Sequence, residues 1–242
     1  MLTDTNIKTP EQMARETFAA LDEESVHTPM RKRHNSDLVN LVGVYAGVKP
    51  AMIFDSGSNL LGHPLTDETN EASNDLALIL QRLGLVAKSV KPSYDITVAP
   101  RVFVAKDLDN LQALAGAFSR LWQKRDETTE RDVGALLGFP QESIEQHIKE
   151  FRGEATERRG VPTPQLQNFA YLAFPPDDKG YQIVLDKYVL PLKSATEQYI
   201  PQTYRIMMKK NFRQKLHDMR DLIFPSVKRT LDMRRIFTKM IE

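Results

Sequence analysis

Two hydrophobic periodicities occur along the chain, one typical of an α-helix and one typical of a short strand. Helical periodicity extends from Thr9, from Asn35 or Ser36 to Gly47, from Thr66 to Leu83, from Asp107 to Trp122 and from Pro140 to Phe151. Short β-prone runs occur at residues 51–54, 85–90, 99–107 and 168–174. Pro10 at a first helical position, and Gly47 and Gly84 at helix ends, agree with these boundaries.

The last part of the chain is expected to be mostly helical. Residues 181–199 have helical periodicity, but Pro191 should kink or break this helix because proline has no backbone N–H to donate. Five apolar residues at steps of three or four then predict one amphipathic face: Met208, Phe212, Leu216, Met219 and Ile223. Earlier in the chain, residues 123–131 are expected to form a charged turn before the apolar stretch DVGALLGFP.

These elements predict an α+β fold that is helix-rich, with a small mixed sheet of about four strands and a helical C-terminal part. The segment RGEATERRGVPTP has the composition of a linker. We therefore expect a body over residues 1–152, a linker over 153–164 and a second part over 165–242. The second part should contain one strand and basic amphipathic helices that pack on the body.

Composition narrows the class of protein but indicates no activity. The 242 residues are 41% hydrophobic and 27% charged, as in ordinary water-soluble globular proteins. No apolar run reaches the ~18–20 residues of a membrane-spanning helix, and no secretory signal is recognisable, so we expect a cytoplasmic protein. The sequence has no cysteine, which excludes disulfides, thiolate metal sites and cysteine nucleophiles.

The net charge of +1 is unevenly distributed. Residues 203–242 hold 11 Lys or Arg against 4 Asp or Glu, so an acidic body carries a basic tail. The candidate cations for contact with a macromolecule are Lys209, Lys210, Arg213, Arg220, Lys228, Arg229, Arg234 and Arg235. Such helices could pack on the acidic body, dock on a protein partner or an anionic membrane surface, or bind nucleic acid. No known nucleic-acid-binding motif supports the last alternative.

An apolar run followed by Asp-Ser-Gly-Ser resembles the active-site loop of an aspartic protease. Asp55, Ser56, Gly57 and Ser58 follow the predicted strand at residues 51–54. An aspartic protease needs two carboxylates that share a proton, and no second Asp-Ser/Thr-Gly occurs in the chain. We therefore interpret the segment as a turn that ends the strand, with a backbone anion cradle around Gly57 as the alternative.

Two short motifs resemble those of one family. Residues 46–51, AGVKPA, are similar to an AGIKPA motif, and residues 133–140, VGALLGFP, are similar to an IGxFLGYP motif. The family is a bacterial domain of unknown function, so the resemblance implies a related fold over residues 38–151 and no activity. The family also places a strand and a helix at the positions of residues 101–104 and the stretch after them. Where it tends to have His-Glu, this chain has Arg131-Asp132.

Two cations at the ends of predicted strands are candidate ligand-binding residues. Lys49 lies between a predicted helix end and a strand, where it could bind an anionic group or neutralise the negative end of the helix dipole. Arg101 begins another predicted strand and has the same two interpretations. The five histidines show no metal-binding spacing, and no Gly-rich phosphate loop occurs, so we predict no metal site and no cofactor.

The sequence supports three hypotheses about function and contains no complete catalytic motif. In the first, the protein binds or acts on an anionic small molecule through Lys49, Arg101 and residues 55–58, because open sheets tend to hold ligands at strand ends. This hypothesis requires the two cations to share one pocket. In the second, the basic helices of residues 203–242 make the protein an adaptor for a protein partner, in preference to nucleic acid. In the third, the protein forms oligomers or has a structural role.

Overall fold

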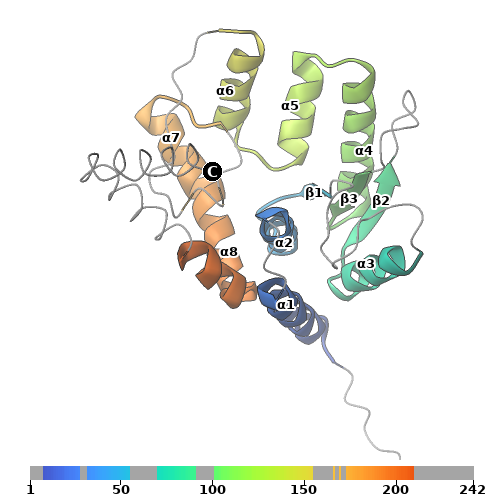
Figure 1. Cartoon of the computed structure of the whole chain (residues 1–242). Coiled ribbons are helices and arrows are strands. Elements are labelled where there is room, and N and C mark those ends of the chain that lie inside the picture. Colours follow the sequence, from blue (N-terminus) through green and yellow to red (C-terminus); the bar gives the residue numbers. More distant parts are fainter. Residues whose placement is uncertain are drawn as a thin grey trace, which may run out of the picture.

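The computed structural model describes residues 8–27, 32–54, 70–90, 101–154, 166, 169 and 173–209. Its helices are α1 (Pro10–His27), α2 (Lys32–Tyr45), α3 (Asn70–Arg82), α4 (Leu108–Gln123), α5 (Glu127–Leu136), α6 (Gln141–Phe151), α7 (Asp178–Val184), the π-helical η2 (Leu185–Val189) and α8 (Leu190–Tyr199). Its strands are β1 (Ala51–Phe54), β2 (Val86–Val90) and β3 (Arg101–Ala105). Residues 201–209 form a further helical stretch. Figure 1 shows α4, α5 and α6 in a row, with α2 between the sheet and α8.

The fold is α+β, and its sheet is antiparallel with the order β1-β3-β2. The expected mixed sheet of about four strands is therefore corrected to an antiparallel sheet of three strands within the described residues. The run at residues 168–174 is not a strand where it is described, because Phe169 lies in a 3-10 turn and Ala173 and Phe174 are irregular. Phe169 and Phe174 are nevertheless buried, so the apolar character of this run reflects core packing rather than strand pairing.

Alternating side chains give the sheet two buried faces. Phe103 and Ala105 of β3 belong to a hydrophobic cluster with residues of α4 and α5, whereas Val104, between them, belongs to a second cluster on the opposite face. The register pairs Ala51 with Ala105 and Met52 with Val104, so β1 divides its side chains in the same way. The sheet thus separates a smaller core under α4 and α5 from a larger one.

The larger core joins the N-terminal helices to η2 and α8. Its most deeply buried side chains include Phe18 of α1, Leu38 of α2, Tyr188 of η2 and Leu192 of α8. Residues on both sides of the expected linker at 153–164 therefore share one core, and α8 packs directly on α2. The division of the chain into a body and a second part stays a prediction.

A buried carboxylate on α1 caps the helical stretch at residues 201–209. Asp22 is 1% exposed, and its two carboxylate oxygens accept hydrogen bonds from the backbone N–H groups of Gln202 (2.8 Å) and Thr203 (2.7 Å). The first N–H groups of a helix have no acceptor within that helix, so Asp22 acts as an N-cap supplied from the other end of the described chain. This contact fixes α1 against residues 201–209.

The charged segment at residues 123–131 is mostly helical, which corrects the expected turn. Asp126 accepts a hydrogen bond from the backbone N–H of Thr129 (3.0 Å), and the Thr129 hydroxyl accepts one from the backbone N–H of Asp126 (3.0 Å). This capping box starts α5 at Glu127, with Thr129 at the position that Glu or Gln usually occupies. The result is one more helix between α4 and α6 than the sequence predicted, and it carries Glu130.

Pro191 does not end the helix in which it lies. The hydrogen-bond pattern widens instead into the π-helical segment η2, where the backbone N–H of Leu190 donates to the carbonyl of Leu185. Helix α8 then continues from Leu190 with Pro191 in its first turn, where a missing N–H costs little. The widening places Tyr188 of η2 in the larger core.

Candidate functional site

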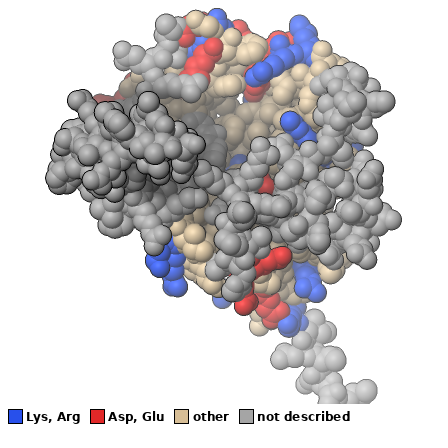
Figure 2. Space-filling model, viewed as in Figure 1, with Lys and Arg blue, Asp and Glu red and all other residues tan. Residues whose placement is uncertain are grey.

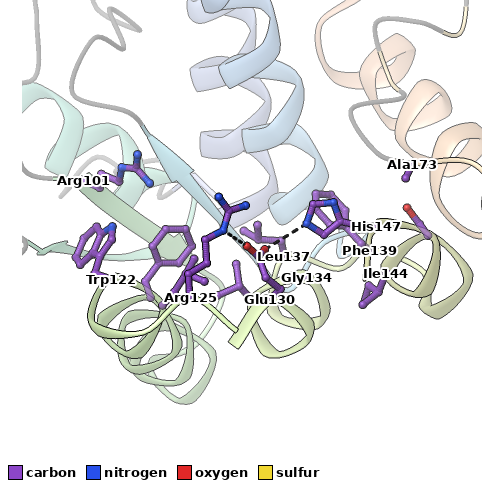
Figure 3. Close-up of a pocket in the computed structure, with 14 residues that line it drawn as sticks. Arg101, Trp122, Arg125, Glu130, Gly134, Leu137, Phe139, Ile144, His147 and Ala173 are labelled. Carbon is purple, nitrogen blue, oxygen red and sulfur yellow. Dashed lines mark hydrogen bonds and ion pairs between the residues drawn. The ribbon is translucent and has the colours of Figure 1, made fainter. Parts of the chain in front are cut away.

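A cavity of about 620 Å³ lies between α4, α5 and α6 and reaches the first residue of β3. Most of its wall is apolar and includes Phe118, Leu121, Trp122, Leu137, Phe139 and Ile144. Its ionisable lining residues are Arg101, Arg125, Glu130 and His147 (Figure 3). A cavity of this size, with apolar walls and a few polar groups, is typical of a small-molecule site.

The guanidinium of Arg101 lies against two aromatic rings at one end of the cavity (Figure 3). Its Cζ atom is 5.7 Å from the ring centroid of Phe118 and 5.9 Å from that of Trp122. Such cation–π contacts orient a guanidinium through its flat face. The strand pattern explains this position, because Arg101 lies on the same face of β3 as Phe103, which packs edge-on against Phe118.

Nearer the middle of the cavity, the carboxylate of Glu130 contacts Arg125 and His147. Its Oε1 accepts a hydrogen bond from Nε of Arg125, and its Oε2 lies 3.3 Å from Nε2 of His147. The Glu130 side chain is 10% exposed and that of His147 is 46% exposed, so the carboxylate is the buried centre of this cluster. The described lining thus contributes two guanidinium groups, those of Arg101 and Arg125, and one carboxylate, that of Glu130.

This arrangement can bind and can exchange a proton. The contact with Glu130 favours the His147 tautomer that carries its proton on Nε2, which leaves Nδ1 as an acceptor. A histidine held in this way beside a cavity can take a proton from a bound ligand. The Ser143 hydroxyl also lines the cavity, and within the described part of the chain its side chain has no hydrogen-bond partner although the residue is 2% exposed. Buried hydroxyl groups are normally paired, so a ligand atom is a suitable partner.

Lys49 does not belong to the described lining of the cavity. The residue is 5% exposed, and its Nζ donates a hydrogen bond to Oδ1 of Asn40 (2.7 Å) on α2. The same Nζ is 5.6 Å from the ring centroid of Phe139 and 5.7 Å from that of Tyr188. Burial lowers the pKa of Lys49 to about 8, because the protein interior solvates an ammonium less well than water does.

The two motifs of the family resemblance touch each other at this point. Gly138 has a φ of +79°, and a Cβ atom there would lie 2.6 Å from Cδ of Pro50 and 3.1 Å from Cα of Lys49. Glycine is therefore required both by the backbone conformation and by the close approach. Gly43, on α2, leaves space for the aliphatic part of the Lys49 side chain. A Cβ at this position would lie 2.8 Å from Cδ1 of Leu192 and 3.0 Å from Cδ of Lys49.

The cavity between α4, α5 and α6 is lined by one of the two cations predicted from the sequence. Arg101 lines the cavity on the α4 side of the sheet, whereas Lys49 contacts Tyr188 of the larger core. A joint site of Lys49 and Arg101, which the first hypothesis requires, stays a prediction. Asp55, Ser56 and Ser58, the other members of that predicted site, lie outside the described residues.

The predicted basic surface is described at one position. Lys209 is exposed at the end of the helical stretch 201–209. The other candidate cations lie outside the described residues: Lys210, Arg213, Arg220, Lys228, Arg229, Arg234 and Arg235. On the face that Figure 2 shows, Lys and Arg side chains of the described part are interspersed with Asp and Glu at both ends. The described surface in this view therefore forms no continuous basic patch.

Sequence reasoning missed the cluster of Arg125, Glu130 and His147. A turn at residues 123–131, as expected from the sequence, would not have the helical spacing that puts Glu130 and Gly134 on the same face of α5. The available signal was Asp126 three residues before Thr129, which is the spacing of a capping box. With that helix in place, α5 and α6 form an antiparallel pair whose polar side chains meet.

Comparison with protein-family models, curated protein sequences and solved structures finds no match to this chain. The resemblance to a bacterial domain of unknown function therefore stays a prediction. Within the described residues, no group of three or more His, Asp or Glu side chains is arranged to hold a metal ion. None of the described helices has the length and apolar character that crossing a membrane requires.

Proposed function

We propose that the protein binds a small anion with an apolar body in the cavity between α4, α5 and α6. One observation carries this proposal: the described lining of a mostly apolar cavity contains two arginines, Arg101 and Arg125, and one carboxylate, Glu130, and Arg101 lies against its aromatic wall. An anionic group at Arg101 would be attracted by charge, and an apolar body would replace water along the wall. A volume of about 620 Å³ accommodates a ligand of one or two rings.

The adaptor hypothesis and the oligomer hypothesis are supported by the sequence alone. Most of the basic residues that motivate the adaptor hypothesis lie outside the described residues, and Lys209 alone does not define a surface. The cavity, by contrast, has described lining residues on α4, α5 and α6. We therefore place the function at the cavity and treat the two alternatives as separate questions.

The test uses Trp122, which is the one tryptophan of the chain and lines the cavity. Its fluorescence should change when benzoate, phenyl phosphate or cyclohexanecarboxylate is added to the full-length protein. Benzamide and benzyl alcohol, which are similar in size but neutral, should bind at least about tenfold more weakly because they lack the charge that Arg101 attracts. Equal responses to the charged and neutral compounds would contradict the proposed selectivity.

A pair of matched variants locates the binding site. Arg101→Gln should weaken binding of the anions by about 1.5–3 kcal/mol, roughly 10-fold to 150-fold, which is the range for a hydrogen bond to a charged group. Arg120→Gln removes an arginine on α4 that pairs with Asp132 (3.0 Å) and does not line the cavity, so it should leave binding unchanged. Equal effects of the two substitutions, or no fluorescence change with any anion, would refute the proposed function.

A further inference from the structure

One aromatic side chain belongs to the lining of the cavity and also contacts the buried amine of Lys49. Phe139 lines the cavity, and its ring centroid is 5.6 Å from Nζ of Lys49. The neighbouring residue, Gly138, touches the backbone of Lys49, so the segment that lines the cavity rests directly on the residue that carries the amine. Phe139 therefore connects the cavity with the surroundings of the amine.

The surroundings of the amine favour reactivity. Among the described residues, Nζ donates a hydrogen bond to Oδ1 of Asn40 and lies over the rings of Phe139 and Tyr188. Because burial lowers its pKa to about 8, roughly a quarter of the Lys49 amine is uncharged at pH 7.5, against about one part in a thousand at a pKa of 10.5. The uncharged amine is the nucleophilic form, and desolvated lysines serve as nucleophiles toward carbonyl compounds.

We propose that Lys49 forms an imine with the carbonyl group of a ligand held in the cavity, once the Phe139 ring has turned aside. This proposal rests on the proposed function and narrows the ligand class to anionic aldehydes and ketones. The ammonium of Lys49 first loses one proton to solvent. The amine nitrogen then bonds to the carbonyl carbon, and the carbonyl oxygen leaves as water with the two remaining amine hydrogens. The step consumes no oxidant, reductant or other co-reactant.

A purely structural role is the competing explanation for Lys49. In that case the amine would only bind Asn40 and fill the space between α2 and η2, and no carbonyl compound would reach it. The two explanations differ in whether Lys49 reacts faster than a less buried lysine that also lies over an aromatic ring. Lys193 provides the comparison, because its Nζ lies 5.3 Å from the ring centroid of Tyr204 and its pKa is raised, chiefly through its hydrogen bond with that tyrosine.

The test uses 4-carboxybenzaldehyde, an aromatic anion that carries a carbonyl group. The full-length protein is incubated with this probe and sodium cyanoborohydride at pH 7.5, and the reduced adducts are mapped by peptide mass spectrometry over time. We expect the adduct on Lys49 to form at least tenfold faster than that on Lys193. Benzoate, which lacks the carbonyl group that reacts, should slow the reaction of Lys49 without affecting Lys193.

A variant tests the route past Phe139. Phe139→Leu shortens the side chain between cavity and amine and should raise the rate at Lys49 severalfold, with Lys193 unchanged as the internal control. Equal labelling of Lys49 and Lys193 in both proteins would overturn the imine proposal, as would labelling of Lys49 that benzoate does not slow. If benzoate still changes Trp122 fluorescence in that case, the proposed function stands; if it does not, the proposed function fails as well.

Discussion

Replacing Lys49 with methionine should change how the stability of the protein depends on pH. Methionine keeps an unbranched apolar stem but cannot be protonated. Burial lowers the pKa of Lys49 from 10.5 to about 8, so the folded protein holds this proton less tightly than the unfolded chain does. Stability rises with pH wherever the unfolded chain binds more protons, which for Lys49 is the range between about 8 and 10.5.

The magnitude follows from the two pKa values. The difference between 10.5 and about 8 corresponds to roughly 3 kcal/mol of free energy of unfolding. This cost is fully present in the wild-type protein below pH 8 and disappears as the pH approaches 10.5. The Lys49→Met variant lacks the cost at every pH, but it leaves Oδ1 of Asn40 without its donor, which costs about 1 kcal/mol throughout. The variant should therefore be about 2 kcal/mol more stable than the wild type at pH 7 and about 1 kcal/mol less stable at pH 10.5.

The assay is urea unfolding of both proteins at intervals from pH 7 to pH 10.5, followed by circular dichroism. Tyrosines and the other lysines titrate in both proteins, so the difference in the free energy of unfolding isolates Lys49. Lys106→Met, at an exposed position, serves as the control and should show no comparable trend. If the free energies of unfolding of Lys49→Met and wild type differ by the same amount at every pH in this range, the pKa of Lys49 is not lowered in the folded protein and the reasoning is refuted.

Three further predictions concern stability and use the same urea assay. Gly138→Ala should lower the free energy of unfolding by about 2–4 kcal/mol, because φ is +79° and the new Cβ would lie 2.6 Å from a side-chain atom of Pro50. Gly153 has a φ of +72° but open space around it, so Gly153→Ala should lower it by only about 1 kcal/mol. Equal losses in the two variants would argue against the close approach at Gly138. Gly43→Ala should destabilise by about 1–3 kcal/mol, while Gly116→Ala, also in a helix but with no close contact, should stabilise by up to about 1 kcal/mol. Asp22→Asn should lower the free energy of unfolding by about 1–2 kcal/mol, because the group that accepts hydrogen bonds from two backbone N–H groups loses its charge. An unchanged urea midpoint would show that this cap contributes little to stability.

Much of the fold could be predicted where local signals act within a few residues. The Asp107 N-cap, the helix after it and the left-handed cap at Gly84 are read directly from sequence, and the structure confirms them. Strand pairing is not local: the apolar run at residues 168–174 has strand-like composition, yet its described residues are not in a strand. The mixed four-stranded sheet was wrong because apolar runs of this length fit a core loop as well as a strand.

The candidate site was less predictable than the fold because it depends on contacts between helices. Arg101 lines the cavity, but the sequence does not indicate that Lys49 lies outside the described lining and packs against Gly138. Glu130 and His147 are 17 residues apart and meet only because α5 and α6 pack side by side. The chemistry of single residues therefore drew attention to Arg101, which lines the cavity, but it could not indicate the residues around it.

The cap that Asp22 provides has a consequence for synthesis on the ribosome. Its two backbone donors belong to Gln202 and Thr203, which are translated about 180 residues later. Until they emerge, a carboxylate that is destined for the interior has no partner there and must stay in water, so α1 cannot settle into its final position. The nascent chain should thus complete its larger core late, after most of the polypeptide has left the exit tunnel, and should depend on protection of apolar surface until then.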